Sequence, residues 1–217
     1  GTIGQTIVSE YGVKFKAALL EGQKTGLFLD QRENRRAIRR YVKGAAVLDC
    51  FCNDGGFALY AALAGAASVL AIDSSETAIA NAKVNATINE AQKIEFETAD
   101  VFDKLPELEK AGRRFDVVIL DPPSFSRNKK TVATALKGYR EINAGALRLI
   151  NSGGILVTAS CSHHVSDESF IEAIEAGARL THRSLQLLEW RGAAPDHPTL
   201  PAMPETAYLK FGIFAVL

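Results

Sequence analysis

The sequence lacks several features that would assign it to a familiar class of protein. Its 25 basic and 25 acidic residues cancel, which argues against a strong whole-chain electrostatic footprint for nucleic acid. No apolar run reaches the about 18 residues that a membrane span needs. No charged and then apolar leader stands at the start, and no internal repeat is found. We therefore expect a protein that does not contact membranes.

Cysteine is scarce as well. The three cysteines, Cys50, Cys52 and Cys161, are an odd number that offers no disulfide framework. The Cys50-x-Cys52 spacing lacks the second ligand pair that a zinc site needs. We predict a protein without a metal site in a reducing, cytoplasmic setting.

Short apolar runs alternate with helical patterns along most of the chain. Strands are expected at 45–50, 67–73, 94–100, 115–121 and 154–160, and helices at 57–65, 75–89, 102–112 and 130–150. Pro106 is expected to turn or break the third of these helices. Continuous apolar strands separated by helices imply a parallel sheet covered on both faces. The fold class expected is a doubly wound α/β domain.

The two ends of the chain depart from this alternation. Strands at 183–190 and 206–217 follow each other with a proline-rich loop and no helix between them, so we expect them to pair antiparallel. The sheet then has seven strands, mostly parallel, and ends in an antiparallel hairpin. At the front, 1–30 is expected to be a small hairpin-like extension ahead of a main domain over 31–217, which begins with a helix over 31–42.

Carboxylates follow the strands where a ligand would bind. In open α/β sheets, ligands bind beyond the carboxyl ends of the strands, at the switch point. The first four strands end at Asp49, Asp73, Asp100 and Asp121, and the fifth leads into Cys161. A lone aspartate after a strand is often only a helix cap, but four in succession indicate a site.

The loop after the first strand suggests which ligand this is. Gly55 and Gly56 allow a ligand to approach the backbone before a helix begins. The pattern is not G-x-G-x-x-G, so a phosphate-cradling loop is weakly supported, and Asp54 further disfavours an anion. Asp73 is placed to accept hydrogen bonds from ribose hydroxyls, and Asp100 from an adenine amino group. These features favour the adenosine half of S-adenosylmethionine, whose sulfonium also suits a site lined by carboxylates.

The same stretches resemble a known family. The resemblance rests on GLFLDQRENR (26–35), VLDCFCNDGGFAL (47–59), FDVVILDPPSF (115–125), GGILVTASCS (153–162) and APDHPTLPAMPETAYLK (194–210). They are similar to the class I S-adenosylmethionine-dependent methyltransferases, and more narrowly to the bacterial and archaeal 23S rRNA cytosine-5 methyltransferases. Members of that family usually carry a small RNA-binding domain ahead of the matching region.

The resemblance implies an enzyme that forms 5-methylcytosine in large-subunit ribosomal RNA. Carbon 5 of cytosine is a poor nucleophile until a thiolate adds at carbon 6. The family's nucleophile is a cysteine in a T/S-C-S motif, which Cys161 matches. Asp121 of DPPSF is expected to hydrogen bond the ring at nitrogen 3. The expected substrate-binding residues are Pro122, Pro123 and Phe125, with Phe125 stacked on a flipped base.

The resemblance also implies a cofactor-binding set around the ends of the first four strands. Gln31 lies ahead of the sheet and is expected to close over S-adenosylmethionine. The full set comprises Gln31, Asp49, Phe51, Asn53, Gly55, Gly56, Phe57, Asp73, Ser74, Asp100, Val101 and Asp121.

Purely structural roles are alternatives to several of these assignments. Cys161 taken alone would be packing, because cysteine is among the most buried residue types. Tyr139 is either a substrate contact or a helix-packing residue, and 196–198 is expected to be a turn. Two rival functions stay open: an exocyclic amino-group methyltransferase that uses DPPSF without a cysteine nucleophile, and a non-catalytic RNA-binding relative. The glycine pattern disfavours a dinucleotide oxidoreductase. The modified nucleotide and the oligomeric state, a homodimer included, stay open.

Overall fold

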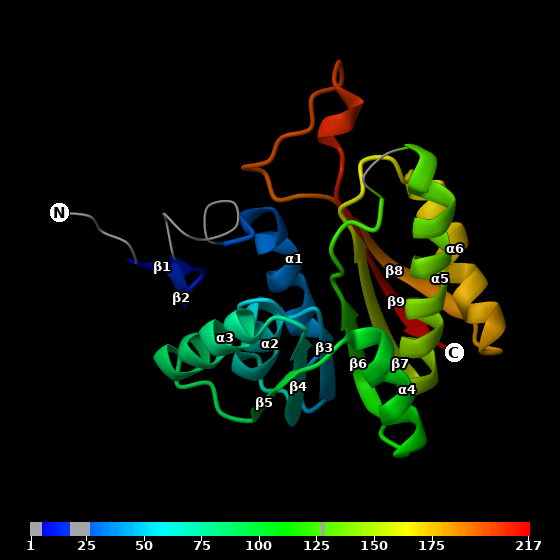
Figure 1. The fold of residues 1–217 in the computed structure, drawn as a ribbon. Helices are drawn as coiled ribbons and strands as arrows, with labels where there is room; N and C mark the ends of the chain where they lie inside the picture. Colours follow the sequence, from blue (N-terminus) through cyan, green and yellow to red (C-terminus); the bar gives the residue numbers. More distant parts are fainter. Residues whose placement is uncertain (1–5, 18–26, 127–128) are drawn as a thin grey trace.

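The computed structural model describes residues 6–17, 27–126 and 129–217. Most of them form a seven-stranded sheet that lies between two layers of helices (Figure 1). The strand order is β5-β4-β3-β6-β7-β9-β8. Because the chain starts in the middle of the sheet and reverses direction there, the predicted doubly wound arrangement is confirmed.

The first five strands of this sheet are parallel. They are β3 (Ala46–Cys50), β4 (Ser68–Asp73), β5 (Ile94–Thr98), β6 (Phe115–Leu120) and β7 (Ile150–Ser160). Cys50 lies opposite Ile72 on one side and Leu120 on the other, so the carboxyl ends of these strands meet at one edge. The loops at that edge are brought together, as the sequence predicts.

The last two strands close the sheet with the expected antiparallel hairpin. β9 (Lys210–Val216) pairs antiparallel with β7 and with β8 (Leu185–Arg191). In this register Ser160 lies opposite Lys210, so the start of β9 stands beside the segment that leads into Cys161.

Helices cover both faces of the sheet (Figure 1). One layer holds α1 (Arg32–Ala37), α2 (Gly56–Leu63) and α3 (Glu76–Ile88), and the other holds α4 (Val101–Lys110), α5 (Val132–Leu149) and α6 (Asp167–Leu180). Short 3-10 turns lie at Leu29–Gln31, Ile38–Arg40, Lys129–Thr131 and Pro204–Thr206. Strand side chains alternate between the layers, with Val47 in the first core and Leu48 in the second.

Two helical predictions need correction. Pro106 does not break the helix expected at 102–112, because α4 runs through it. The apolar face formed by Leu105 and Leu108 packs into the core, and this burial outweighs the about 3 kcal/mol that an interior proline costs. The second correction is α6, which the sequence analysis left unassigned. Ser166 caps α6 by accepting a hydrogen bond from the Ser169 N–H at 3.2 Å.

The front of the chain forms a small sheet of its own. Its two antiparallel strands are β1 (Thr6–Glu10) and β2 (Val13–Ala17). Asn85 of α3 and Asn89, which follows this helix, accept hydrogen bonds from backbone N–H groups of β2. The buried Arg35 guanidinium pairs with Glu10 at 2.6 Å, which ties the hairpin to α1. The division into an extension over 1–30 and a domain over 31–217 stays a prediction, and residues 18–26 lie outside the described part.

The helices within the described ranges are too short or too polar to cross a lipid bilayer.

Candidate active site

The loop between β3 and α2 is strained at alternate positions. Phe51, Asn53 and Gly55 have φ angles of 61°, 47° and 80°, a region that residues other than glycine seldom adopt. The Asn53 N–H donates to Asp73 Oδ2 at 2.9 Å, and the Cys52 N–H donates to the Ile72 carbonyl at 3.0 Å. The end of β4 therefore holds this loop in place. Strain held in this way is typical of ligand-binding loops.

The two glycines of this loop are required by its packing. A Cβ on Gly55 would lie 3.1 Å from the Ala82 Cβ, and one on Gly56 would lie 2.9 Å from the Arg35 Cδ. The loop is therefore pressed against α3 on one side and against the buried Arg35 on the other. The close approach that the sequence analysis ascribed to a ligand is made, at these positions, by the protein itself. Contacts of Gly55 and Gly56 with a cofactor stay a prediction.

Asp49 is a fully buried carboxylate beneath the loop. It lies within β3, opposite Ala71, and is therefore set back from the strand end at which it was expected. Its Oδ2 accepts the Ala58 N–H of α2 at 2.8 Å, whereas Oδ1 has no hydrogen-bond partner among the described residues. Burial raises the pKa of Asp49 well above its usual range, and the nearby Asp121 and Asp73 raise this pKa further.

An orphaned buried oxygen of this kind calls for a partner. Burial disfavours the ionised form of this carboxyl group, and a nearby positive charge favours it. A cationic ligand would therefore suit this position. S-adenosylmethionine carries two positive charges, on its sulfonium and its amino group, so the residues present fit this cofactor.

Two further carboxylates are fixed by backbone N–H groups. Asp73 accepts from Asn53 and, through Oδ1, from the Ser75 N–H at 2.9 Å. Asp100 caps α4 by accepting from the Phe102 N–H at 2.7 Å. Each carboxylate oxygen has a second lone pair, so these bonds leave room for ribose or adenine hydrogen bonds. Those ligand contacts stay predictions.

The other predicted cofactor residues are distributed unevenly. Phe57 is buried and stacks on Phe211 with ring centroids 5.8 Å apart. Val101, the first residue of α4, is buried in the core between the sheet and the layer of α4, α5 and α6. Phe51 is half-buried and Ser74 is exposed. The side chains of Phe57 and Val101 therefore take part in packing, and the contacts of all four residues with a cofactor stay predictions.

Asp121 follows β6 and is oriented by Gln31. The Gln31 Nε2 donates to Asp121 Oδ1 at 2.8 Å. The Gln31 Oε1 accepts from Asn34 Nδ2 at 2.7 Å, and the Asn34 Oδ1 accepts from Arg191 Nε at 3.0 Å. Gln31 and Asn34 are buried, so this relay fixes which end of the Gln31 amide faces Asp121. Sequence reasoning placed Gln31 in the site but missed this partner.

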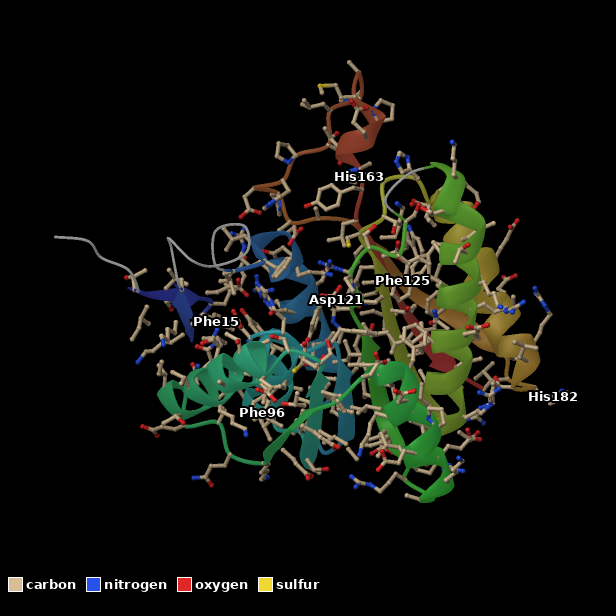
Figure 2. The ribbon with its side chains drawn as sticks, in the orientation of Figure 1. Phe15, Phe96, Asp121, Phe125, His163 and His182 are labelled. Atoms are coloured by element: carbon tan, nitrogen blue, oxygen red, sulfur yellow. The ribbon has the colours of Figure 1, made fainter. Side chains whose placement is uncertain are left out.

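The rest of the DPPSF loop lies beside an aromatic cluster. Pro122 is buried, Pro123 is exposed and Phe125 is half-buried. The Phe125 ring lies 4.7 Å from that of Tyr139 and 5.8 Å from that of Phe102. Asp121, Phe125 and His163 all lie toward the end of the sheet where the tail loop stands, whereas His182 lies at the opposite end (Figure 2).

A chain of buried hydroxyls holds the segment around Cys161. The Ser160 Oγ donates to the Tyr139 hydroxyl at 2.9 Å, and that hydroxyl lies 3.0 Å from Ser162 Oγ. Ser162 Oγ lies 2.9 Å from Ser124 Oγ in the DPPSF loop. Ser160, Ser162 and Tyr139 are all fully buried. Tyr139 thus ties two loops together from a fully buried position, which favours its packing role over a contact with substrate.

The three cysteines differ in how accessible their side chains are. Cys161 lies between two serines that face inward and is itself only half-buried. Cys50 and Cys52 are buried, and burial raises the pKa of both thiols. Because the thiolate is the reactive form, neither is suited to act as a nucleophile. Cys161 is the accessible thiol of the three.

The tail loop between β8 and β9 is fastened over the same edge (Figure 1). The Tyr208 hydroxyl donates to Asp30 Oδ2 at 2.6 Å, and Arg32 pairs with Asp196 at 2.9 Å. The Tyr208 ring also lies 5.1 Å from that of His163. The segment ahead of the sheet and the tail therefore form one wall of the site together, although 164 and 178 residues separate the partners of these two contacts.

Lys210 is a charged residue that the sequence analysis did not single out. It opens β9 and is 3% exposed. Its Nζ donates to the Ser162 carbonyl at 2.9 Å and to the Tyr208 carbonyl at 3.1 Å. The available signal was a lysine at the head of the apolar run KFGIFAV.

The described residues contain no group of three or more His, Cys, Asp or Glu side chains that could hold a metal ion. A hollow of about 300 Å³ lies at the amino ends of β3 and β6, lined in part by Lys43, Asp116 and Gly154. It is at the opposite edge of the sheet from the residues above and contains none of them.

Comparisons with known proteins agree with this geometry. A family model described as S-adenosylmethionine-dependent methyltransferase matches residues 3–214. Ribosomal RNA large subunit methyltransferase I of Shewanella frigidimarina is 43% identical over 206 residues, which is 94% of this chain and 52% of the relative. The protein of the same name from Aliivibrio fischeri is 44% identical over 207 residues, with the same two shares. The chain thus spans about half the length of the curated relatives that it matches.

Among solved structures, the methyltransferase SMU.776, complexed with SAH, has the same fold. Its TM-score is 0.88 at 24% identity, and the match covers 99% of this chain and 57% of that one.

Proposed function

The chain belongs to the S-adenosylmethionine-dependent methyltransferase family, and we propose that it forms 5-methylcytosine in large-subunit ribosomal RNA. In this proposal Cys161 is the nucleophile. The names of its relatives support the choice of substrate. The observation that carries the chemistry is the chain of hydroxyl groups from Ser160 to Ser124. It links the segment of Cys161, the accessible thiol, to the loop that begins with Asp121.

The bound cofactor would supply a methyl group activated on a positively charged sulfur. Asp49 would face one of the positive charges with its buried, unpartnered oxygen. Asp73 would bind the ribose hydroxyls and Asp100 the adenine amino group. The strained loop over 51–56 would hold the cofactor in place between them.

Cys161 would start the reaction on the base. Its thiolate adds to carbon 6 of cytosine, and the electrons of the 5,6 double bond move toward carbon 5 and nitrogen 3. Nitrogen 3 would share a proton with the Asp121 carboxylate, and this proton stabilises the ring as negative charge reaches it. Carbon 5 then takes the methyl group. A base removes the proton from carbon 5, the double bond forms again, and the Cys161 thiolate leaves. The shared proton stays with Asp121 when the thiolate leaves.

Several residues would position the groups that take part in this reaction. Gln31 holds the plane of the Asp121 carboxylate through its 2.8 Å hydrogen bond. Pro122 and Pro123 restrict the loop that follows. Phe125, braced by Tyr139 at 4.7 Å, would stack on the cytosine once it has flipped out of the RNA.

The test is mass mapping of ribosomal RNA from cells with and without the gene. We expect one 5-methylcytosine of the large-subunit RNA to disappear with the gene and to return with the wild-type gene. A gene carrying Cys161→Ala should not restore it. His164→Ala is the matched control, because His164 is an exposed neighbour with no part in the mechanism, and it should restore the mark.

The rival functions predict other results. Undiminished methyl transfer by Cys161→Ala would rule out the covalent mechanism and favour an amino-group methyltransferase. A chain that does not bind S-adenosylmethionine at micromolar concentrations would instead be a non-catalytic RNA-binding relative.

A further inference from the structure

Lys210 places a buried ammonium group next to the segment that carries Cys161. The β7–β9 pairing sets Lys210 opposite Ser160, and its Nζ donates to the carbonyl of Ser162, the residue after Cys161, at 2.9 Å. A second bond, to the Tyr208 carbonyl at 3.1 Å, fixes the ammonium from the tail side. The group is therefore held in one position by the backbone on both sides of the site.

A buried lysine needs compensation for the loss of its hydration. Within the described ranges, no carboxylate lies within 4 Å of the Lys210 ammonium, and its third N–H has no acceptor there. The acidic groups that act on it are Asp167 of α6 and the Cys161 sulfur. Burial lowers the pKa of Lys210, and these two groups oppose that effect. Asp167 is exposed and binds the Trp190 Nε1 at 3.2 Å.

We propose that Lys210 is the fixed cation that keeps the Cys161 sulfur ionised as a thiolate. The inference rests on the proposed function, in which Cys161 must attack as a thiolate and later leave as one. Lys210 touches neither the base nor the cofactor in this scheme, so it is a positioning residue that acts through the sulfur. It takes the place that a histidine fills in many cysteine enzymes.

Three other described groups near this segment, Tyr139, Tyr208 and His163, are less suited to supply this charge. Tyr139 and Tyr208 act on Cys161 electrostatically, and burial raises the pKa of both hydroxyls. They are therefore neutral at physiological pH. Tyr208 also faces the Asp30 carboxylate, whose negative charge would disfavour a thiolate. His163 is exposed and makes its contacts with the tail loop: its Nδ1 lies 3.1 Å from the Glu205 carbonyl, and its ring lies 5.1 Å from that of Tyr208.

The test measures the ionisation of Cys161 without cofactor or RNA. The rate at which iodoacetamide alkylates Cys161 is followed against pH, with the modified peptide identified by mass spectrometry. We compare the wild-type chain with Lys210→Gln, which keeps N–H donors but not the charge, and with Lys210→Arg, which keeps the charge. Lys137→Gln, on the exposed face of α5, is the matched control.

Lys210→Gln should raise the pKa of the Cys161 thiol by about one or more, so alkylation near pH 7 should slow about tenfold. Lys210→Arg and Lys137→Gln should stay close to wild type. An unchanged pH curve in folded Lys210→Gln would overturn the proposal. So would a second result that needs no variant: a Cys161 pKa in the folded wild-type chain equal to or above that of the chain unfolded in urea.

This outcome is separate from that of the proposed function. If Lys210 lowers the pKa of Cys161 but Cys161→Ala still transfers methyl groups, the covalent mechanism fails and the charge assignment stands. If Cys161→Ala is inactive and the pKa of the Cys161 thiol is the same in Lys210→Gln as in the wild type, the covalent mechanism stands and the role of Lys210 is refuted.

Discussion

Removal of one buried hydroxyl should disturb the segment that carries Cys161. Tyr139→Phe deletes the oxygen that accepts a hydrogen bond from Ser160 and lies 3.0 Å from Ser162 Oγ. The ring itself would keep its contacts with Phe125 at 4.7 Å and Phe170 at 5.0 Å. The substitution therefore isolates the hydrogen bonds from the packing.

The magnitude follows from what each serine loses. Ser162 keeps the hydroxyl of Ser124 at 2.9 Å as a partner, so its loss is an ordinary bond of about 1 kcal/mol. The hydroxyl proton of Ser160, which is fully buried, loses its acceptor, which costs about 1–3 kcal/mol. We expect the free energy of unfolding to fall by about 2–4 kcal/mol, which lowers Tm by about 4–16 °C for a domain of this size.

The assay combines urea unfolding with methyl-transfer kinetics. Tyr139→Phe should lower kcat more than it raises the KM for S-adenosylmethionine, because it loosens the thiol rather than the cofactor loop. Tyr60→Phe is the matched control: its buried hydroxyl bonds to the Glu10 carbonyl and carboxylate at 3.0 and 2.9 Å, away from Cys161. It should lose similar stability and keep kcat. Unchanged stability and kcat in Tyr139→Phe would refute the reasoning.

Three other perturbations test separate parts of the structure. Gly56→Ala should destabilise the fold by about 1–3 kcal/mol in urea unfolding, because its Cβ would lie 2.9 Å from the Cδ of the buried, ion-paired Arg35. Asp49→Asn should weaken S-adenosylmethionine binding in calorimetry about tenfold, yet stabilise the cofactor-free chain at neutral pH. The folded pKa of Asp49 is raised, so its contribution to stability is present below the unfolded pKa and is lost as pH rises toward the folded one. Gln31→Ala should lower kcat about tenfold or more in steady-state assays, because Asp121 loses a hydrogen bond to a charged group.

Each of these has its own contrary result. Gly192→Ala is the control for Gly56→Ala, since its Cβ would lie at an ordinary 3.7 Å from the Leu209 carbonyl; equal effects of the two would contradict the packing argument. For Asp49→Asn, the stability difference from wild type should grow between about pH 4 and pH 7, and a difference that is flat with pH would show that the carboxylate is not perturbed. For Gln31→Ala, a large rise in the S-adenosylmethionine KM at constant kcat would assign Gln31 to the cofactor instead.

Local sequence patterns predict much of the fold. The strands follow from continuous apolar runs, and Ser75 caps α3 as a serine before a helical pattern should, accepting the Ala78 N–H at 3.2 Å. The missed α6 also had local signals. Ser166 precedes the acidic pair Asp167 and Glu168, and apolar residues then recur at helical spacing. Helix α6 is therefore predictable from its local sequence.

The errors within the site have a different origin. The run of carboxylates marked the correct edge of the sheet. The greater depth of Asp49 follows from the pairing of β3 with β4, which sets Asp49 opposite Ala71, two residues before Asp73, and no local pattern reports that register. Gly56 is spaced by Arg35, and Lys210 is buried by the pairing of β9 with β7. Such long-range contacts leave no local signature, so the charge beside Cys161 emerged only from the folded chain.

One measurement tests most directly whether Cys161 forms a covalent bond with cytosine. Ribosomal RNA that contains 5-fluorocytidine cannot release a proton from carbon 5, so the thiolate cannot leave after methyl transfer. Incubation with this RNA and S-adenosylmethionine should yield a protein–RNA adduct that survives denaturation, with the link mapped by mass spectrometry to Cys161. Absence of the adduct from a chain that methylates unmodified RNA, or an adduct that persists in Cys161→Ala, would contradict the account.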